Sequence, residues 1–563
     1  MSGKPEEANA SGLNHGYYNL GLYRRPVSSS SEEAREWVNR GLIWSYGFNH
    51  EESAKCFERA IASDSNCVLA YWGLAYVLGP NYNKPWEFFD EVELEQVMKR
   101  THSVVEQATA RAGNASPVEK ALVYALKFRY PLEQVAEQNW SIWNESYAHA
   151  MGMVYKEFPD DLDIATLYVD ALMNLTPWQL WDINTGEPAP KARTLEAKDI
   201  LERAMAQDGG SHHPGLLHLY IHLMEMSNTP EAALDAANTL RDLVPDAGHL
   251  DHMPTHIDVL VGDYQNAITS NQKAIVADDA FFARENPLQF YTLYRMHDLH
   301  FRIYAAMFAG QSRVTLETVA RLEATLPEEL LRVESPPMAD WLEGFLAMRV
   351  HALIRFGRWQ EILELPLRED RQLYCATNAM VYYAAGVALA ATGKVDQAAR
   401  QRELFAAAAR DVPESRMVFN NKCVDILRVA EAMLDGELEY RRGNFDTAFS
   451  HLRAAMKRSY DLPYDEPWGW MQPPSHALGA LLVEQGHLDK AVDVYAEDLG
   501  FNSNLPRALQ HPKNVWSLHG YHECLVKLGR LDEARAVKPE LDAAIAVADI
   551  PIKASCYCRT SVF

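Results

Sequence analysis

One turn signature recurs along the chain and constrains the fold more than any other feature. A glycine, three or four variable residues and then a small or aliphatic residue occur at seven positions: Gly262, Gly310, Gly357, Gly393, Gly443, Gly486 and Gly529. Successive glycines are 48, 47, 36, 50, 43 and 43 residues apart. This period is typical of helical hairpins stacked into a solenoid. Glycine suits these turns because the residue after a helix often takes left-handed φ, where a Cβ would clash.

The spacing of apolar residues supports helices throughout. Large apolar side chains recur with a helical period, and the alternation typical of strands is rare. Ser30 and Glu33 have the form of a capping box at the start of the first clear helix. A chain of 563 residues is too long to fold around one compact hydrophobic core. A repeat architecture has no such size limit, because each repeat packs only on its neighbours. The sequence therefore predicts an all-α fold.

Several stretches resemble the tetratricopeptide repeat (TPR). The matching stretches read GKVDQAARQRELFAAAARDVP, GNFDTAFSHLRAAM, GHLDKAVDVYAEDL and, near the start, FNHEESAKCFERAIASDSN. The resemblance covers most of residues 33–547, with repeats longer than the family's 34-residue period. It implies a right-handed α-solenoid, an inner groove for ligands and, by default, a protein partner. We predict a leader (1–30), a TPR-like solenoid (31–547) and a C-terminal tail (548–563), with extended loops at 175–192 and 462–474.

Histidines are concentrated between about residues 210 and 310 and share one phase relative to the turns. His249, His252 and His256 lie 13, 10 and 6 residues before Gly262, and His297 and His300 lie 13 and 10 before Gly310. These offsets span about 60° of a helix. Pro254 interrupts this stripe, so either a helix begins there or the helix is kinked. Pro214 is expected to begin the preceding helix, which leaves His212 and His213 before it.

The TPR resemblance implies that this stripe faces the inner groove, where we predict a metal site. The candidate metal ligands are His218, His222, His249, His252, His256, His297 and His300. Glu225 and Tyr304 are candidate catalytic residues, and Asp251, Asp258 and Asp298 are candidate acceptors for imidazole N–H groups. Whether other histidines join the site stays open: His212, His213, His351, His476, His519 and His522.

Three functions fit this pattern. Imidazole suits copper, iron and zinc, and a shell with few carboxylates favours copper or iron. We therefore expect a metal-dependent oxidoreductase that acts on a small organic substrate in the groove. The alternatives are a non-catalytic TPR scaffold that binds a protein or peptide, and a zinc-dependent hydrolase. Histidines that form a polar network or a metal-free ligand groove remain a further interpretation.

Composition and motif content argue against several other classes of function. The net charge of −24 argues against nucleic-acid and anionic-membrane binding, which need clustered lysine and arginine. No secretory h-region or stretch of 18 apolar residues is present, so no membrane partner is expected. Seven scattered cysteines favour a reducing, cytoplasmic location without a disulfide framework. No phosphate-binding loop, C-x-x-C pair or H-E-x-x-H motif occurs.

Overall fold

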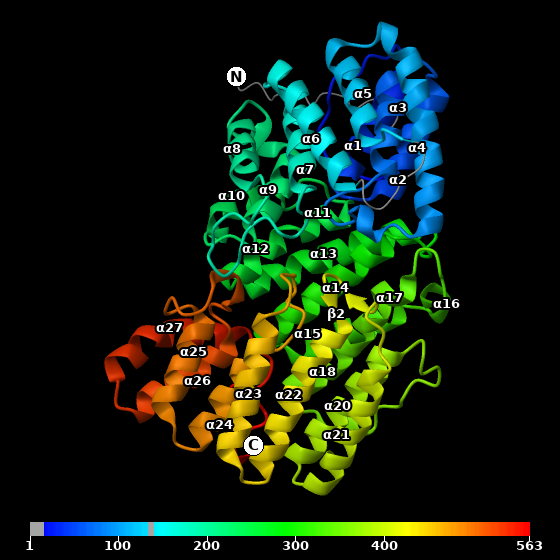
Figure 1. Ribbon diagram of the computed structural model, residues 1–563. Helices are drawn as coiled ribbons and strands as arrows, with labels where there is room; N and C mark the ends of the chain where they lie inside the picture. Colours follow the sequence, from blue (N-terminus) through cyan, green and yellow to red (C-terminus); the bar gives the residue numbers. More distant parts are fainter. Residues whose placement is uncertain (1–15, 133–139, 563) are drawn as a thin grey trace.

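The computed structural model describes residues 16–132 and 140–562, and it is helical nearly throughout (Figure 1). Residues 1–15 of the predicted leader lie outside the described residues. The first half contains α1 (Glu32–Tyr46), α2 (His50–Ser63), α3 (Val68–Leu78), α4 (Glu91–Arg111), α5 (Pro117–Arg129), α6 (Trp140–Glu157), α7 (Leu162–Met173), α8 (Thr194–Met205), α9 (Pro214–Met224), α10 (Leu234–Leu240), α11 (Gly248–His252), α12 (Pro254–Val261) and α13 (Tyr264–Phe282).

The second half continues the same stacking of hairpins. It contains α14 (Thr292–Phe308), α15 (Ser312–Ala324), α16 (Glu328–Leu331), α17 (Met338–Leu342), α18 (Met348–Arg355), α19 (Trp359–Leu363), α20 (Cys375–Ala391), α21 (Val395–Arg410), α22 (Cys423–Arg441), α23 (Phe445–Tyr460), α24 (Pro474–Glu484), α25 (Leu488–Leu499), α26 (Val515–Lys527) and α27 (Leu531–Val547). In the described chain the only strands are β1 (Met417–Val418) and β2 (Asn421–Lys422), a short antiparallel pair. The all-α prediction is confirmed.

The turn glycines adopt the conformation that their spacing predicts. All seven have φ between 62° and 83°. At Gly310, the Gly310 N–H donates to the Met307 carbonyl and the Gln311 N–H to the Ala306 carbonyl. These bonds satisfy carbonyls left free at the end of α14 and let the chain reverse into α15. The repeats are therefore helical hairpins closed by left-handed glycines.

One apolar core runs through most of the stack. It extends from Tyr18 to Trp516, and a second cluster lies among α22 to α27. Figure 1 shows α1 to α13 in the upper part and α14 to α27 in the lower part, with α9 and α11 to α14 in the middle. The predicted solenoid thus brings the histidine-rich helices to the centre of the molecule, where the two halves meet.

The Phe57 ring packs closely against two glycines in the helices of the first hairpins. A Cβ at Gly73 would lie 2.3 Å from the fully buried Phe57 ring, and one at Gly41 would lie 2.8 Å from it. We expect Gly73→Ala to lower the free energy of unfolding by about 1–3 kcal/mol, since an added methyl overpacks the core. Chemical denaturation measures this effect. Gly113→Ala is the matched control, because nothing lies within 4 Å of its Cβ position, and equal stability of both variants would contradict the prediction.

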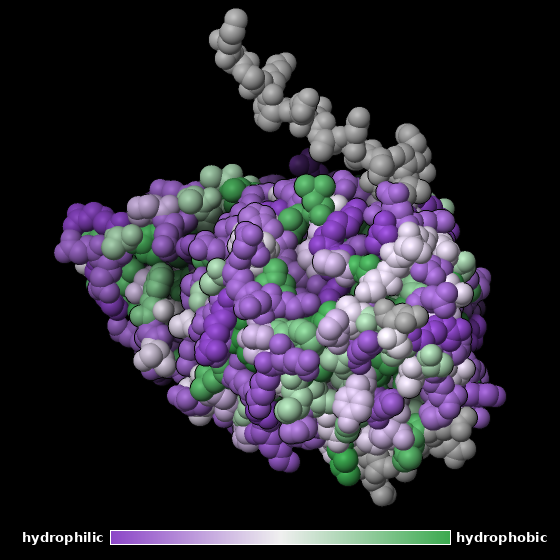
Figure 2. All heavy atoms as spheres, turned by 90° about the horizontal axis from the view of Figure 1, so that it is seen from above, coloured by the Kyte–Doolittle hydropathy of each residue, from purple (hydrophilic) through white to green (hydrophobic). Residues whose placement is uncertain are grey.

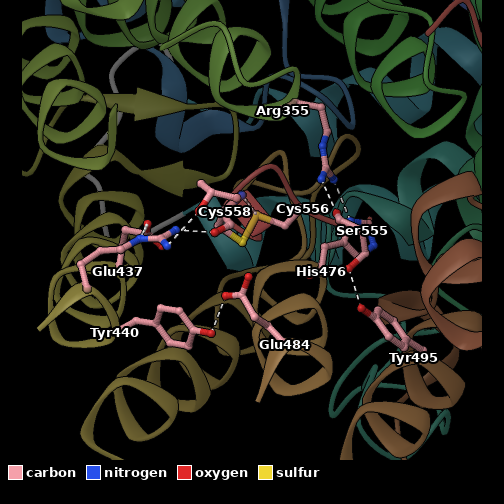
Figure 3. The surroundings of a disulfide bond; sticks show 11 residues. Arg355, Glu437, Tyr440, His476, Glu484, Tyr495, Ser555, Cys556 and Cys558 are labelled. Carbon is pink, nitrogen blue, oxygen red and sulfur yellow. Dashed lines mark hydrogen bonds and ion pairs between the residues drawn. A yellow bond between two sulfur atoms is a disulfide. The ribbon is translucent and has the colours of Figure 1, made fainter. Parts of the chain in front are cut away.

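The last described residues, 548–562, pack against the repeats. Arg355 donates to the Ser555 carbonyl at 2.5 Å, and the Ser555 and Tyr495 hydroxyl oxygens lie 2.6 Å apart (Figure 3). The sequence predicts no disulfide framework, and in the described chain the single disulfide is local, between Cys556 and Cys558. The remaining cysteines are free and buried: Cys56, Cys67, Cys375, Cys423 and Cys524. Among the described helices, none is long and apolar enough to cross a bilayer.

Candidate metal centre

The candidate site is built on four neighbouring helices. His218 and His222 lie on α9, His249 and His252 on α11, His256 on α12, and His297 and His300 on α14. These seven side chains belong to residues that are between 0 and 6% exposed. Their burial shows that the histidines are inside the protein rather than on an open groove.

Two prolines place the helix starts that bring these side chains together. Pro214 is the first residue of α9, and His213 caps that helix by accepting from the Leu216 N–H at 3.2 Å. Pro254 is the first residue of α12, so of the two predicted possibilities the helix begins there. Proline suits this position because its missing N–H has no partner in the first turn anyway. His249 and His252 consequently arrive from the separate helix α11.

The first group of imidazoles comprises His218, His222 and His249. One ligand atom of each lies within 4.8 Å of the others. His218 Nδ1 lies 2.5 Å from the Tyr46 carbonyl, so this nitrogen donates and Nε2 keeps its lone pair. His218 Nε2, His222 Nε2 and both ring nitrogens of His249 are buried without a hydrogen-bond partner. Unpaired buried polar atoms are costly, and a bound metal ion would satisfy them.

The second group comprises His252, His256 and His297, whose ligand atoms also lie within 4.8 Å of one another. His252 Nδ1 lies 2.7 Å from Asn271 Oδ1 and 3.3 Å from Asp298 Oδ1. The Nε2 atoms of His252 and His256 face each other at 2.9 Å. The second group therefore also directs nitrogen lone pairs toward one space, as a metal ion requires.

Glu225 connects the two groups. Its Oε1 lies 3.0 Å from His222 Nδ1, and its Oε2 lies 2.5 Å from His256 Nδ1. Metal-bound imidazoles usually donate their second N–H to such a carboxylate, which orients the ring. Glu225 also lies within 4.8 Å of His222 and His256 through its own oxygen, so it is a possible ligand as well. Its position suits an orienting residue at least as well as the predicted catalytic role.

Other predicted site residues lie elsewhere. His300 Nε2 lies 2.9 Å from the Met471 sulfur, outside both groups. Tyr304 packs between Phe301 and Phe308 rather than against an imidazole of either group. Asp258 pairs with Arg241 at 2.9 Å. His476 lies 3.1 Å from Asp498, and His213 lies 3.3 Å from Asp163.

Two loops cover the imidazoles. Residues 174–193 place Trp178 against His222, with ring centroids 5.6 Å apart. Residues 461–473 bring Glu466 Oε2 to 3.3 Å from His256 Nδ1. Glu466, Asn271 and the Tyr46 carbonyl are not among the residues predicted from the sequence. A single sequence carries no signal for them, because they approach from distant segments.

A pocket reaches the covered site from one side. It encloses about 740 Å³ of empty space, including space open to solvent, and His222, His256 and His297 are among its lining residues. Most of the other lining side chains are aromatic, including Trp178, Phe290, Trp341 and Phe419. The imidazole cluster thus borders a mainly apolar pocket.

Burial keeps the imidazoles neutral. It lowers the pKa of His222 and His252 to about 3, and it lowers the pKa of His218, His249, His256 and His297 well below the usual value. Burial also raises the pKa of Glu225. A neutral imidazole has the free lone pair that a metal ion needs, so these rings are ready to bind near pH 7.

His351 allows this effect of burial to be measured outside the two groups. Burial lowers its pKa to about 3. Below about pH 6.5 the unfolded chain binds a proton at His351 and the folded chain does not, so stability falls as pH falls. We expect the unfolding free energy of wild type relative to His351→Phe to drop by about 1.4 kcal/mol per pH unit from pH 6.5 to 4.5. Denaturation of metal-free protein tests this, and parallel pH profiles would contradict it.

Of the comparisons with known proteins, only the comparison with solved structures gives matches. No known protein family matches the sequence, and no curated protein matches it. One similar structure is "Structure of Naa15/Naa10 bound to HypK-THB", with 12% identity, 91% of this chain and 70% of that chain covered, and a TM-score of 0.22. Another is "Crystal structure of APC/C hetero-tetramer Cut9-Hcn1", with 13% identity, 92% and 96% covered, and a TM-score of 0.24.

The prediction of a metal-dependent oxidoreductase that acts on a small organic substrate in an open groove is not upheld. The physical reason is that the imidazoles are buried inside the protein, whereas the prediction requires them to line an open groove. The TPR-like fold and a histidine cluster able to hold a metal remain.

Proposed function

We propose that this protein is a TPR-like scaffold that holds transition-metal ions in its interior and binds a protein partner on its outer surface. The observation that carries the metal part is the set of buried imidazole nitrogens that face one another without hydrogen-bond partners. All-nitrogen ligand sets suit copper, iron or zinc, and affinity for divalent ions generally increases toward copper. Among these metals, this order favours copper.

The metal would cross-link the middle of the solenoid. Its ligands come from α9, α11, α12 and α14, and the covering loops come from residues 174–193 and 461–473. Ligands from separate segments meet only in the folded chain, so metal binding would contribute directly to folding. A scaffold gains a fixed shape from such a cross-link, which suits a surface that must match a partner.

The outer face of α5 and α6 supports a protein partner. Tyr124 and Ile142 are each 60% exposed, and Met153 is 55% exposed. Ile142 and Met153 are eleven residues apart, so they lie within about 20° on one face of α6. Helices α5 and α6 pack together, which puts Tyr124 on the neighbouring helix. Figure 2 views the molecule from above and shows hydrophobic residues among a mostly hydrophilic surface.

The metal part is tested by elemental analysis of protein purified without a histidine tag. We expect at least one transition-metal ion per chain in wild type and a clearly lower metal content in the His218→Gln/His222→Gln double variant. His102→Gln is the matched control, because His102 has a 38% exposed side chain far from either imidazole group in sequence. Trace metal in wild type, or full retention in the double variant, would refute the assignment.

The partner part is tested by cross-linking mass spectrometry in cells that express the protein naturally. We expect cross-links from α5 and α6 to one defined protein, and their loss in a variant with serine at Tyr124, Ile142 and Met153. A control variant with serine at Val276, Leu404 and Leu531 removes exposed apolar side chains elsewhere. The same cross-links in both variants would refute a partner on this face. So would the absence of any cross-link between the wild-type chain and another protein.

A further inference from the structure

Two of the possible ligand groups consist of imidazoles alone. His218, His222 and His249 share no member with His252, His256 and His297, and each set has its ligand atoms within 4.8 Å. Two further groups, each with one carboxylate, connect these sets: Glu225 with His222 and His256, and Asp298 with His249 and His252. The sets are adjacent, because the His222 and His256 ring centroids lie 5.6 Å apart and those of His249 and His252 lie 5.7 Å apart. Three imidazoles with an open fourth position are a common ligand set for a first-row transition metal.

In each set, two of the three rings have an acceptor beside Nδ1. His218 and His222 donate through Nδ1 to the Tyr46 carbonyl and to Glu225, which leaves both Nε2 atoms for a metal. His252 and His256 make the equivalent contacts to Asn271 and to the other oxygen of Glu225. Acceptors on Nδ1 fix the tautomer in which Nε2 is the ligand. Each set therefore has two oriented rings, and the Glu225 carboxylate orients one ring in each set.

The acidic side chains of Glu225, Glu466 and Asp298 are also buried beside the imidazoles. Metal ions bound there would place positive charge next to these carboxyl groups.

We propose that the protein binds two transition-metal ions side by side, one on each set of three histidines, with Glu225 orienting both. This inference rests on the proposed metal-binding function, and it adds the number of ions and their ligands. His300 belongs to neither set, because its Nε2 faces the Met471 sulfur.

Native mass spectrometry during Cu²⁺ titration of chelator-stripped protein tests the count. We expect two copper ions per wild-type chain, one in His249→Gln, one in His297→Gln and none in the double variant. His300→Gln should keep two. The EPR spin count of fully loaded wild type should fall below its copper count because adjacent Cu²⁺ ions couple, whereas each single variant should show one spin per copper.

The number of copper ions in wild type distinguishes a wrong ion count from the absence of a metal site. One copper per wild-type chain overturns the two-ion site and leaves the metal function standing. No copper in wild type overturns both. Loss of both ions in a single variant that keeps the wild-type circular dichroism spectrum and melting behaviour also overturns two independent sets, and the wild-type count decides the matter if a variant fails to fold.

The pocket beside the imidazoles is lined by three histidines of the two sets, His222, His256 and His297. Its other lining side chains are mainly aromatic or aliphatic, with the polar residues Asn83, Asn420 and Asp465 among them. Side chains from both metal sets reach this pocket, since His222 belongs to one and His256 and His297 to the other. Open metal positions would therefore face it.

We infer that the pocket binds an uncharged aromatic molecule with one nitrogen or oxygen donor for the metal. This also rests on the proposed metal site. Calorimetry with 4-phenylimidazole should show binding to copper-loaded protein, at least tenfold weaker binding to metal-free protein, and at least tenfold weaker binding to copper-loaded Trp341→Ala. Phe501→Ala, outside the pocket, should match wild type. Equal affinity with and without copper overturns the metal contact, and unchanged affinity in Trp341→Ala overturns the pocket.

Discussion

Removing the metal from the purified protein is expected to lower its melting temperature sharply. The ligands come from α9, α11, α12 and α14, which are separated in the unfolded chain, so the ion binds the folded state. At a free metal concentration of 1,000 times Kd, this preference stabilises the fold by about 4 kcal/mol. Removal of the metal should also leave buried imidazole nitrogens without partners, which lowers the free energy of unfolding further.

Differential scanning calorimetry with and without a chelator measures this effect. The His218→Gln/His222→Gln variant should melt below metal-loaded wild type and should respond less to the chelator. His102→Gln should behave like wild type, since this side chain is 38% exposed on α4. Identical melting of loaded and stripped wild type would show that the imidazole cluster contributes no metal-dependent stability.

The second large effect is expected at Asp163, which ties the N-terminal segment to α7 and α9. Its carboxylate lies 2.9 Å from Arg25 Nη1 and 3.3 Å from His213 Nε2, and it accepts from the Tyr46 hydroxyl. Burial alone would raise the pKa of Asp163, but Arg25 and the hydrogen bonds outweigh burial and lower it. Asp163→Ala should cost about 3–5 kcal/mol, because it leaves the buried Arg25 without its closest carboxylate.

A double-variant cycle separates the ion pair from simple packing. Arg25→Leu/Asp163→Leu removes both charges and should be less destabilised than Asp163→Ala alone, because no buried charge is left unpaired. The lowered pKa means that the Asp163 contribution is present above about pH 4 and is lost as pH falls. Equal losses in Asp163→Ala and the double variant, measured by chemical denaturation, would contradict an ionic role for Asp163.

Local rules predicted the hairpin turns because turns depend on neighbouring residues. A left-handed residue after a helix is cheapest as glycine, and Gly262 and Gly529 adopt this conformation as their spacing requires. Pro214 and the helix start at Pro254 follow from the same kind of local chemistry. These features need no knowledge of distant contacts.

The site was only partly predictable. The histidine phase indicated that the rings share one space, and the structure does bring six of them together. The histidine phase could not show that His300 faces Met471, because Met471 is 171 positions away in the sequence. Nor could it show Glu225 accepting from both His222 and His256, or the loop that brings Glu466 to His256. The domain boundaries at residues 30 and 547 and the roles of the site residues stay predictions.

The sequence by itself determined the helical repeat, the turn positions and the helices that carry the histidines, because periodicity and glycine chemistry act within about one hairpin. Tertiary structure alone decided that these histidines are buried, that they form two groups and that an aromatic pocket leads to them. The physical reason is that burial and the facing of ring nitrogens depend on segments such as residues 174–193 and 461–473, which meet α9 to α14 only when the solenoid is complete.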